Sequence, residues 1–223
     1  MSLIREDVSN DDVYRGILTR IDLDQFIDYI LMNLWGGNQD WPHNNWYAIR
    51  HRTSNGPFIF YTWDPENYLF GLGVNQTGVD TNHSPGILFS RLRANADFRL
   101  RFADRVHRHL FNDGALSVAA NSRRFQDLVD KLKGPMNAES ARWGDSRTER
   151  PLNTIDTWLP TVDEKLDEYL PRRNDIVLSQ LTAADLYPSV EAPEFQQHGG
   201  DVDTPYTLTL PTSLFSKTYY TLP

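Results

Sequence analysis

The chain has 223 residues, a formal net charge of −8 at pH 7 and no cysteine. The length suits one sizeable domain with part of another, and the six Trp, ten Tyr and eleven Phe favour a packed core over disorder. The charge argues against non-specific nucleic-acid binding, and the lack of cysteine excludes disulfides and thiolate chemistry. The sequence shows neither a signal-peptide pattern nor an apolar run near the roughly 18 residues of a membrane span.

Residues 13–21 form a weak helical stretch, and a stronger helix follows it. Asp22 and Gln25 resemble a capping box, which marks a helix start. The apolar residues that follow are spaced as on one helix face: Phe26, Ile27, Ile30, Leu31 and Leu34. Gly36-Gly37 predicts the end of this helix.

Two segments rich in β-forming residues come next, at 46–51 and 58–63. They are joined by Thr53-Ser54-Asn55-Gly56, and Asn-Gly between such segments predicts a β-hairpin. Residues 71–86 are rich in Gly, Asn, Thr and Pro and are expected to form a long loop.

The middle of the chain is predicted to be helical. Helices are expected at residues 87–93, 96–111, 117–133, 137–143 and 155–170, with Asn174 as the cap of a last helix that ends near Leu186. Helix 96–111 has an apolar face, and its opposite Arg- and His-rich face is interpreted as solvated. Gly134-Pro135 is expected to end helix 117–133.

The pattern changes at Tyr187-Pro188, where helical periodicity stops. Tyr206–Leu210 alternates and 218–222 is rich in β formers, which predicts the first strands of a β-type segment. The fold class is therefore mainly α with a small β-hairpin over 1–186, followed by an incomplete β segment over 187–223.

A possible site lies around the hairpin. Asp40 and Asn45 stand five positions apart in a segment that Gly36, Gly37 and Pro42 keep from being helical, and Asp64 follows a strand. This spacing is typical of a kinase site, in which the first Asp accepts the substrate hydroxyl proton and the Asn and second Asp hold magnesium. A turn-forming role explains each of these residues as well when taken singly.

Several motifs in order carry a family resemblance. They are N-Q-D-W-P-H-N-N-W-Y-A-I-R (38–50), W-D-P-E (63–66), N-Q-T-G (75–78), S-P-G-I-L-F (84–89), F-R-L-R-F-A-D-R-V-H-R-H-L-F (98–111), E-S-A-R-W-G-D (139–145) and L-Y-P-S-V-E-A-P-E-F-Q-Q-H-G-G (186–200). With these the chain resembles the CotH kinase family of divergent, mostly bacterial kinase-like proteins. The last motif resembles the junction to an immunoglobulin-like or chitobiase-C-terminal-like module in larger, secreted or surface-bound relatives.

The resemblance implies a fold like the C-lobe of a protein kinase, with ATP and Mg²⁺ or Mn²⁺ as cofactors and a protein hydroxyl as substrate. It implies that Asp40 is catalytic, that Asn45 and Asp64 bind the cofactor and its metal, and that Glu66 is a further metal ligand.

One departure limits these expectations. The family has an upstream nucleotide-binding N-lobe with a phosphate-binding lysine, whereas this sequence has no lysine before Lys131. The chain is therefore expected to be inactive without an N-lobe, and the alternative is a non-catalytic interaction or structural module.

Two further interpretations are weaker. His43, His107 and His109 could suggest zinc, but the i, i+2 spacing of the last two does not place them on one helix face. Arg142-Trp143 could contact a phosphate or a peptide, and the favoured interpretation is a structural Arg–carboxylate pair beside a buried Trp.

Overall fold

The computed structural model describes residues 5–52, 56–79, 84–146, 148–190, 201–202 and 204–210. The chain divides into two compact units, residues 1–187 and 188–223. In its described part the first unit is mainly helical with a two-stranded antiparallel sheet, as predicted, and it is compatible with a kinase C-lobe-like fold. None of the described helices is both long and apolar enough to cross a bilayer.

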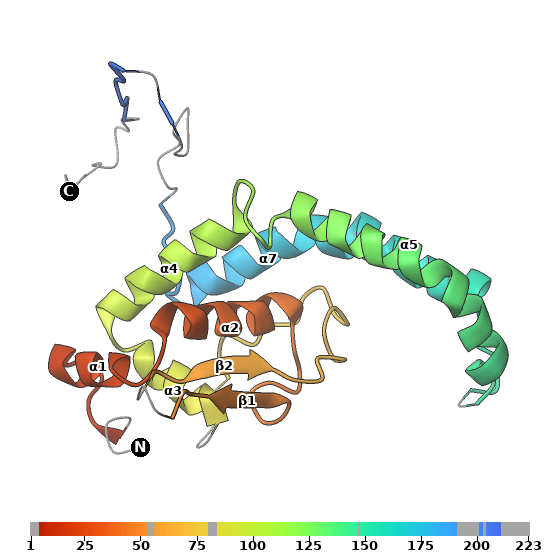
Figure 1. The fold of residues 1–223 in the computed structure, drawn as a ribbon, viewed down its shortest axis with the longest axis horizontal. Helices are drawn as coiled ribbons and strands as arrows, with labels where there is room; N and C mark the ends of the chain where they lie inside the picture. The colour runs from red at the N-terminus through yellow and green to blue at the C-terminus, as the bar shows by residue number, and fades with distance from the viewer. Residues whose placement is uncertain are drawn as a thin grey trace. The chain divides into compact units, whose positions relative to one another are not determined.

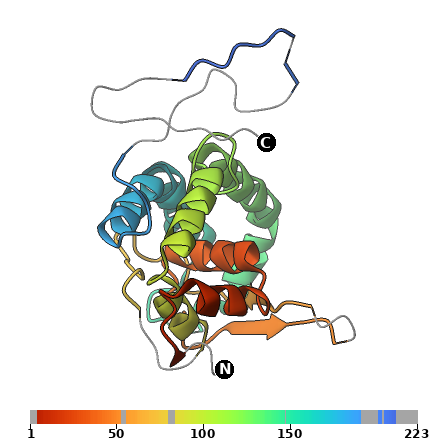
Figure 2. The ribbon, with the colours of Figure 1, turned by 90° about the vertical axis from the view of Figure 1, so that its left-hand side faces the viewer.

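The elements follow in the order α1 (Asp11–Leu18), α2 (Leu23–Gly36), β1 (Trp46–Ile49), β2 (Ile59–Thr62), α3 (Ser84–Leu92), α4 (Ala96–Leu110), α5 (Val118–Trp143), η2 (Thr154–Trp158), α6 (Leu159–Glu164), η3 (Lys165–Tyr169) and α7 (Leu170–Ala183). Helix α2 lies in the middle, with the β1–β2 hairpin on one side and α4 and α7 on the other (Figure 1). Figure 2 shows the hairpin extending outward from the helices.

Helix α2 forms where the sequence predicts it. The Asp22 carboxylate accepts a hydrogen bond from the Gln25 backbone N–H at 3.1 Å, which caps the start of the helix. Gly37 ends it in the left-handed conformation, with φ of +64°. The four residues Phe26, Ile27, Ile30 and Leu31 are fully buried, so the predicted apolar face is the centre of the core.

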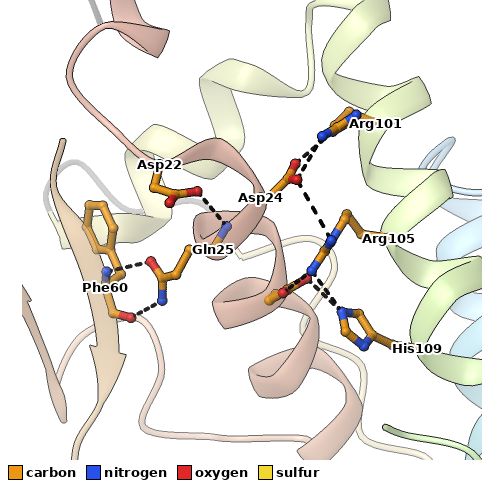
Figure 3. A network of polar contacts seen from close by, with 8 residues as sticks. Asp22, Asp24, Gln25, Phe60, Arg101, Arg105 and His109 are labelled. Carbon is orange, nitrogen blue, oxygen red and sulfur yellow. Dashed lines mark hydrogen bonds and ion pairs between the residues drawn. The ribbon is translucent and has the colours of Figure 1, made fainter. Parts of the chain in front are cut away.

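The predicted capping box forms only in part, because Gln25 is used elsewhere. Its amide oxygen accepts from the Phe60 backbone N–H at 2.7 Å, and its amide nitrogen donates to the Phe60 carbonyl (Figure 3). The Asp22 backbone N–H, which a capping box would bond to Gln25, donates to the Phe58 carbonyl at 3.1 Å. These bonds fasten β2 to the start of α2.

The hairpin has the predicted strands. The register pairs Trp46 with Thr62 and Ile49 with Ile59, and the predicted turn residues Thr53, Ser54 and Asn55 lie outside the described residues. Phe60 points inward, with its ring centroid 4.8 Å from that of Phe26. The 71–86 loop is shorter than predicted, because α3 already begins at Ser84.

The Arg- and His-rich face of α4 was predicted to be solvated. It instead forms ion pairs with α2. Arg101 binds the Asp24 carboxylate through two bonds of 2.7 Å each, and Arg105 lies between Asp24 and Asp28 (Figure 3). His109 contacts Asp28 at 2.9 Å. The opposite face of α4, with Phe98, Phe102 and Val106, is fully buried as expected.

Helix α5 corrects the predicted stop at Gly134-Pro135. It runs through Pro135 to Trp143, a length of 26 residues, and it curves along its length (Figure 1). Its distal part packs against the π-helical turns η2 and η3, and Ser140 contacts Thr154 through their hydroxyls at 3.2 Å. Tertiary packing therefore overrides the local helix-breaking signal.

The last helical region also differs from the prediction. Residues 154–183 form a continuous run of η2, α6, η3 and α7, and Asn174 lies inside α7 instead of capping it. In the second unit, the described residues 204–210 have no regular secondary structure, so the strand expected at Tyr206–Leu210 is absent. The strand expected at 218–222 lies outside the described residues.

Candidate functional site

The loop after α2 places Asp40. The left-handed Gly37 turns the chain out of the helix, and the Asn38 side chain accepts a hydrogen bond from the Asp40 backbone N–H at 3.1 Å. The Asp40 carbonyl accepts from the Asn44 backbone N–H at 3.0 Å, which closes the turn. Asp40 is half-buried, so its carboxylate is held by its surroundings but accessible.

Asn45 joins the segments that carry the two candidate aspartates. Its side-chain amide nitrogen donates to Oδ2 of Asp40 at 3.2 Å and to the Asp64 carbonyl at 3.1 Å. Its backbone carbonyl accepts from Trp63 N–H at 2.8 Å, just before Asp64. Asn45 and Asp64 both have positive φ, +59° and +48°, a strained backbone that clusters at functional sites. Asn45 thus links the Asp40 carboxylate to the backbone of Asp64, whose own side chain is exposed.

Glu66 is less closely tied to this group. It is exposed, as is Asp64, and no hydrogen bond or ion pair connects it to Asp40, Asn45 or Asp64 within the described residues. Its place two residues after Asp64 keeps it near the site along the chain, but its carboxylate is not held there.

Asn67 contacts the candidate site, and the sequence analysis did not single it out. Its side-chain amide donates to the same Asp40 oxygen, Oδ2, that accepts from Asn45. Two amide groups therefore orient one carboxylate oxygen of Asp40 and leave the other, Oδ1, without a hydrogen bond among the described residues. The signal in the sequence was an Asn three positions after Asp64, which is too common after a turn to be singled out.

A buried polar cluster supports the loop from below. The Asn33 side-chain oxygen accepts from Asn38 and from the Tyr68 hydroxyl, both at 2.8 Å. Burial raises the pKa of Tyr68 to about 12, so its hydroxyl stays protonated and remains a donor at neutral pH. The Asn38 carbonyl in turn accepts from Gln76 at 3.0 Å. This cluster connects α2 to the loop that contains Asp40.

Arg173 of α7 completes this support. Its side chain is fully buried, and it donates to the carbonyls of Leu34 and Trp35 at the end of α2 and of Leu72 and Val74 in the following loop. Burial lowers the pKa of Arg173, and the partial negative charge at the end of α2 is what offsets the buried charge. The sequence analysis placed Arg173 between two predicted helices and gave it no role, because nothing local marks a buried arginine.

The donor set fits a hard cation. Carboxylate and amide oxygens are ligands that Mg²⁺ accepts, together with water and phosphate oxygens. Since the Asn45 amide nitrogen faces Asp40 and the Asp64 carbonyl, its oxygen is directed away from both. Among the described residues no three His, Asp or Glu side chains cluster closely enough to share a metal, so carboxylates alone would not complete a shell.

The other candidates are placed elsewhere. His109 contacts Asp28, whereas His107 stacks on Phe111 with centroids 4.6 Å apart and contacts the Tyr187 hydroxyl. The interpretation of Trp143 as buried was wrong, since its side chain is exposed and the Arg142 guanidinium lies over its ring.

Comparisons with known proteins agree with the motifs. A family model described as CotH kinase protein matches residues 1–177, a range that contains Asp40, Asn45, Asp64, Glu66 and Arg173. No curated protein and no solved structure matches the chain. Because the family model covers most of the 223 residues, the chain belongs to the CotH kinase family.

Proposed function

We propose that this chain carries the catalytic and metal-binding residues of an ATP- and metal-dependent protein kinase that transfers a phosphoryl group to protein hydroxyls. The observation that carries the proposal is the Asn45 side chain, whose amide nitrogen joins the Asp40 carboxylate and the Asp64 backbone. Membership of the CotH kinase family supports the reaction class.

In this proposal Asp40 accepts the proton of the acceptor hydroxyl. The amides of Asn45 and Asn67 bind its Oδ2, so its Oδ1, which has no hydrogen bond among the described residues, is the oxygen that would accept the proton. The Asp64 carboxylate and the Asn45 side-chain oxygen would hold Mg²⁺ or Mn²⁺, with Glu66 as a further ligand. When bound, the cation would neutralise charge on the phosphates of ATP.

The phosphates need a further positive group. Kinase sites commonly use a lysine for this purpose, and this sequence has none before Lys131. Because positioning supplies most of the rate in phosphoryl transfer, we expect residues 1–223 alone to give only trace transfer until a partner N-lobe is supplied.

The first test measures cation binding, which does not depend on transfer. We expect about 10 mM Mg²⁺ or Mn²⁺ to raise the melting temperature, since a concentration ten times Kd adds about 1.4 kcal/mol to stability. The shift should disappear in Asp64→Asn and remain in Asp156→Asn, an exposed aspartate far along the chain. A shift unchanged in Asp64→Asn would place the cation elsewhere and overturn the site assignment.

The second test measures transfer of labelled phosphate from ATP to a generic acceptor protein in the presence of Mn²⁺. Trace transfer that is lost in Asp40→Asn, in a variant that keeps its cation-dependent shift, supports the catalytic role of Asp40. Transfer that survives in Asp40→Asn contradicts that role. Cation binding without any transfer, even with an added N-lobe, favours the alternative of a non-catalytic interaction module.

A further inference from the structure

The outward face of the β1–β2 hairpin is apolar and exposed. Alternation along the strands turns Phe60 toward the core and the neighbouring side chains outward. The exposed large side chains on this outward side are Tyr47, Ile49, Tyr61 and Trp63, and we call them the hairpin face. Trp63 is 63% exposed and Ile49 is 50% exposed. Contiguous apolar groups of this kind mark interaction sites.

The aromatic rings of the hairpin face are ordered against one another. Tyr47 and Tyr61 are cross-strand partners whose rings stack with centroids 5.2 Å apart, and Tyr47 meets Trp63 edge-on at 6.1 Å. Rings already fixed in this way lose little conformational entropy when a partner covers them. The hairpin face is therefore preorganised for contact.

The hairpin is basic toward the end of β1 at Arg50, whereas the acidic Asp64 and Glu66 directly follow Trp63 at its other end. Over the described residues 45–52 and 56–63 the sequence contains Arg50, His51 and Arg52 and no acidic residue, although the whole chain carries −8. The Arg50 guanidinium lies 5.2 Å from the centroid of the Phe58 ring, so basic and aromatic groups adjoin at the end of β1. A partner that complements this surface carries negative charge beside apolar groups.

The strand arrangement favours an extended partner. Strand β1 has β2 as its only strand neighbour in the described part of the chain, whereas Phe58, just before β2, is bridged to Ile21. A strand with one open side can pair with an added extended segment, whose alternate side chains then lie over the face of the sheet. Figure 2 shows that the hairpin extends outward from the helices, where a segment can reach it.

We propose that the hairpin face binds an extended protein segment that carries aromatic or aliphatic residues followed by acidic ones. At about 3.3 Å per residue, Arg50 lies roughly 16 Å along the strand from Asn45. A segment beside β1 therefore places its acidic residues about five positions from the residue nearest Asp40. Binding of this segment does not depend on the proposed function. Only the further idea that the segment is the phosphoryl acceptor rests on it.

The test is direct binding without ATP or metal. The probes are two fluorescein-labelled peptides that begin Ser-Tyr-Thr-Tyr-Thr and end in three Glu or in three Lys. Fluorescence anisotropy should show the Glu peptide binding at least tenfold more tightly at low salt, and the preference should weaken as salt screens it. Omitting nucleotide keeps this result independent of the transferase proposal.

Two sets of variants locate the surface. Arg50→Glu with Arg52→Glu should weaken binding of the Glu peptide about tenfold or more, and Tyr47→Ser with Tyr61→Ser should weaken binding of both peptides. The control makes the same charge change on other elements, with Arg108→Glu on α4 and Arg123→Glu on α5, both exposed. This control variant should keep most of the affinity for the Glu peptide. Circular dichroism should show that every variant is folded.

Three outcomes overturn the proposal. One is equal binding of the Glu and Lys peptides, and another is an equal loss of affinity in the control variant. The third is self-association in sedimentation that Tyr47→Ser with Tyr61→Ser abolishes, since the hairpin face would then bind a second copy of the chain. Loss of transfer in Asp40→Asn has no bearing on any of the three.

Discussion

The end of α2 and the far end of α5 are both helix ends, but they are held in different ways. Around Gly36 the polar groups are buried and paired, and Arg173 alone bonds to four carbonyls there. In α5, which the structure describes throughout, Val129 is the one buried residue, and Leu132 and Trp143 are exposed. The loop that follows the rigid end carries Asp40, so the fold fixes its backbone where the candidate site needs fixed geometry.

The largest expected effect comes from removing Arg173. Arg173→Leu removes a donor from four carbonyls. The Leu34 and Val74 carbonyls keep a second donor, from Gly37 N–H and Gln180, whereas the Trp35 and Leu72 carbonyls lose theirs. Each unsatisfied group costs about 1–3 kcal/mol, and the buried packing of the arginine is lost as well. We expect a loss of at least about 3 kcal/mol in the free energy of unfolding, measured by urea denaturation.

The neighbouring arginine provides the control. Arg172 is exposed and pairs with Glu168, so Arg172→Ala should cost less than about 1 kcal/mol. If Arg173→Leu does not fold, Arg173→Lys keeps the charge and loses the fork of donors, and it should still be clearly less stable than Arg172→Ala. Similar losses for Arg173→Lys and Arg172→Ala would contradict a special role of the α2 end.

Two glycines distinguish the regions more sharply. Gly37 has φ of +64°, and an added Cβ would lie 3.2 Å from Val74, so Gly37→Ala should cost about 1–2 kcal/mol. Gly134 lies inside α5 with no atom within 4 Å of an added Cβ, so Gly134→Ala should raise stability by about 0.5–1 kcal/mol. The melting temperature should therefore fall in Gly37→Ala and rise in Gly134→Ala. A shift in the same direction for both variants would contradict the proposed difference between the two helix regions.

What the sequence could predict follows from how local each signal is. Helix α2 and the hairpin were predicted because a cap, an apolar face, glycines and β formers lie within a few residues of one another. The continuation of α5 through Pro135 was not predicted, because η2 and η3, which pack against α5, come from residues later in the chain.

The same division holds for the site. Their spacing predicts Asp40, Asn45 and Asp64 as candidate site residues, and the Asn45 side chain links the Asp40 carboxylate to the Asp64 backbone. Asn67 and Arg173 were not singled out from the sequence. The Asn67–Asp40 hydrogen bond joins residues 27 positions apart, and the buried Arg173 binds carbonyls of another helix, so neither contact leaves a periodic pattern in the sequence.

A smaller effect should appear with pH. Hydrogen bonding by Arg101 lowers the pKa of Asp24 from 3.8; burial would raise that of Asp28, but the bonds from His109 and Arg105 outweigh it. A carboxyl with a lowered folded-state pKa stabilises the fold above about pH 4 and loses this contribution as the pH falls through that pKa.

The measurement is urea denaturation between pH 7 and pH 3. Wild type should lose stability below about pH 4, and Asp28→Asn should reduce that loss by about 0.5–1 kcal/mol. Asp127→Asn, the same change at an exposed position of α5, serves as the control and should leave the pH profile as in wild type. An identical profile for Asp28→Asn would mean that the α2–α4 pairs do not contribute.

The smallest effect is expected where η2 packs against α5. Ile155 is 74% exposed, so truncating it removes almost no buried apolar surface, and Ile155→Ala should change the free energy of unfolding by less than about 0.5 kcal/mol. Val162 in α6 is buried at 6% exposure, and Val162→Ala should cost about 1 kcal/mol or more because it leaves a cavity. Urea denaturation of both variants tests whether this region has a core of its own. Equal losses of unfolding free energy in Ile155→Ala and Val162→Ala would show that Ile155 is covered by a partner in solution. The α2 end and this region would then differ in what packs against them, the chain itself or a partner.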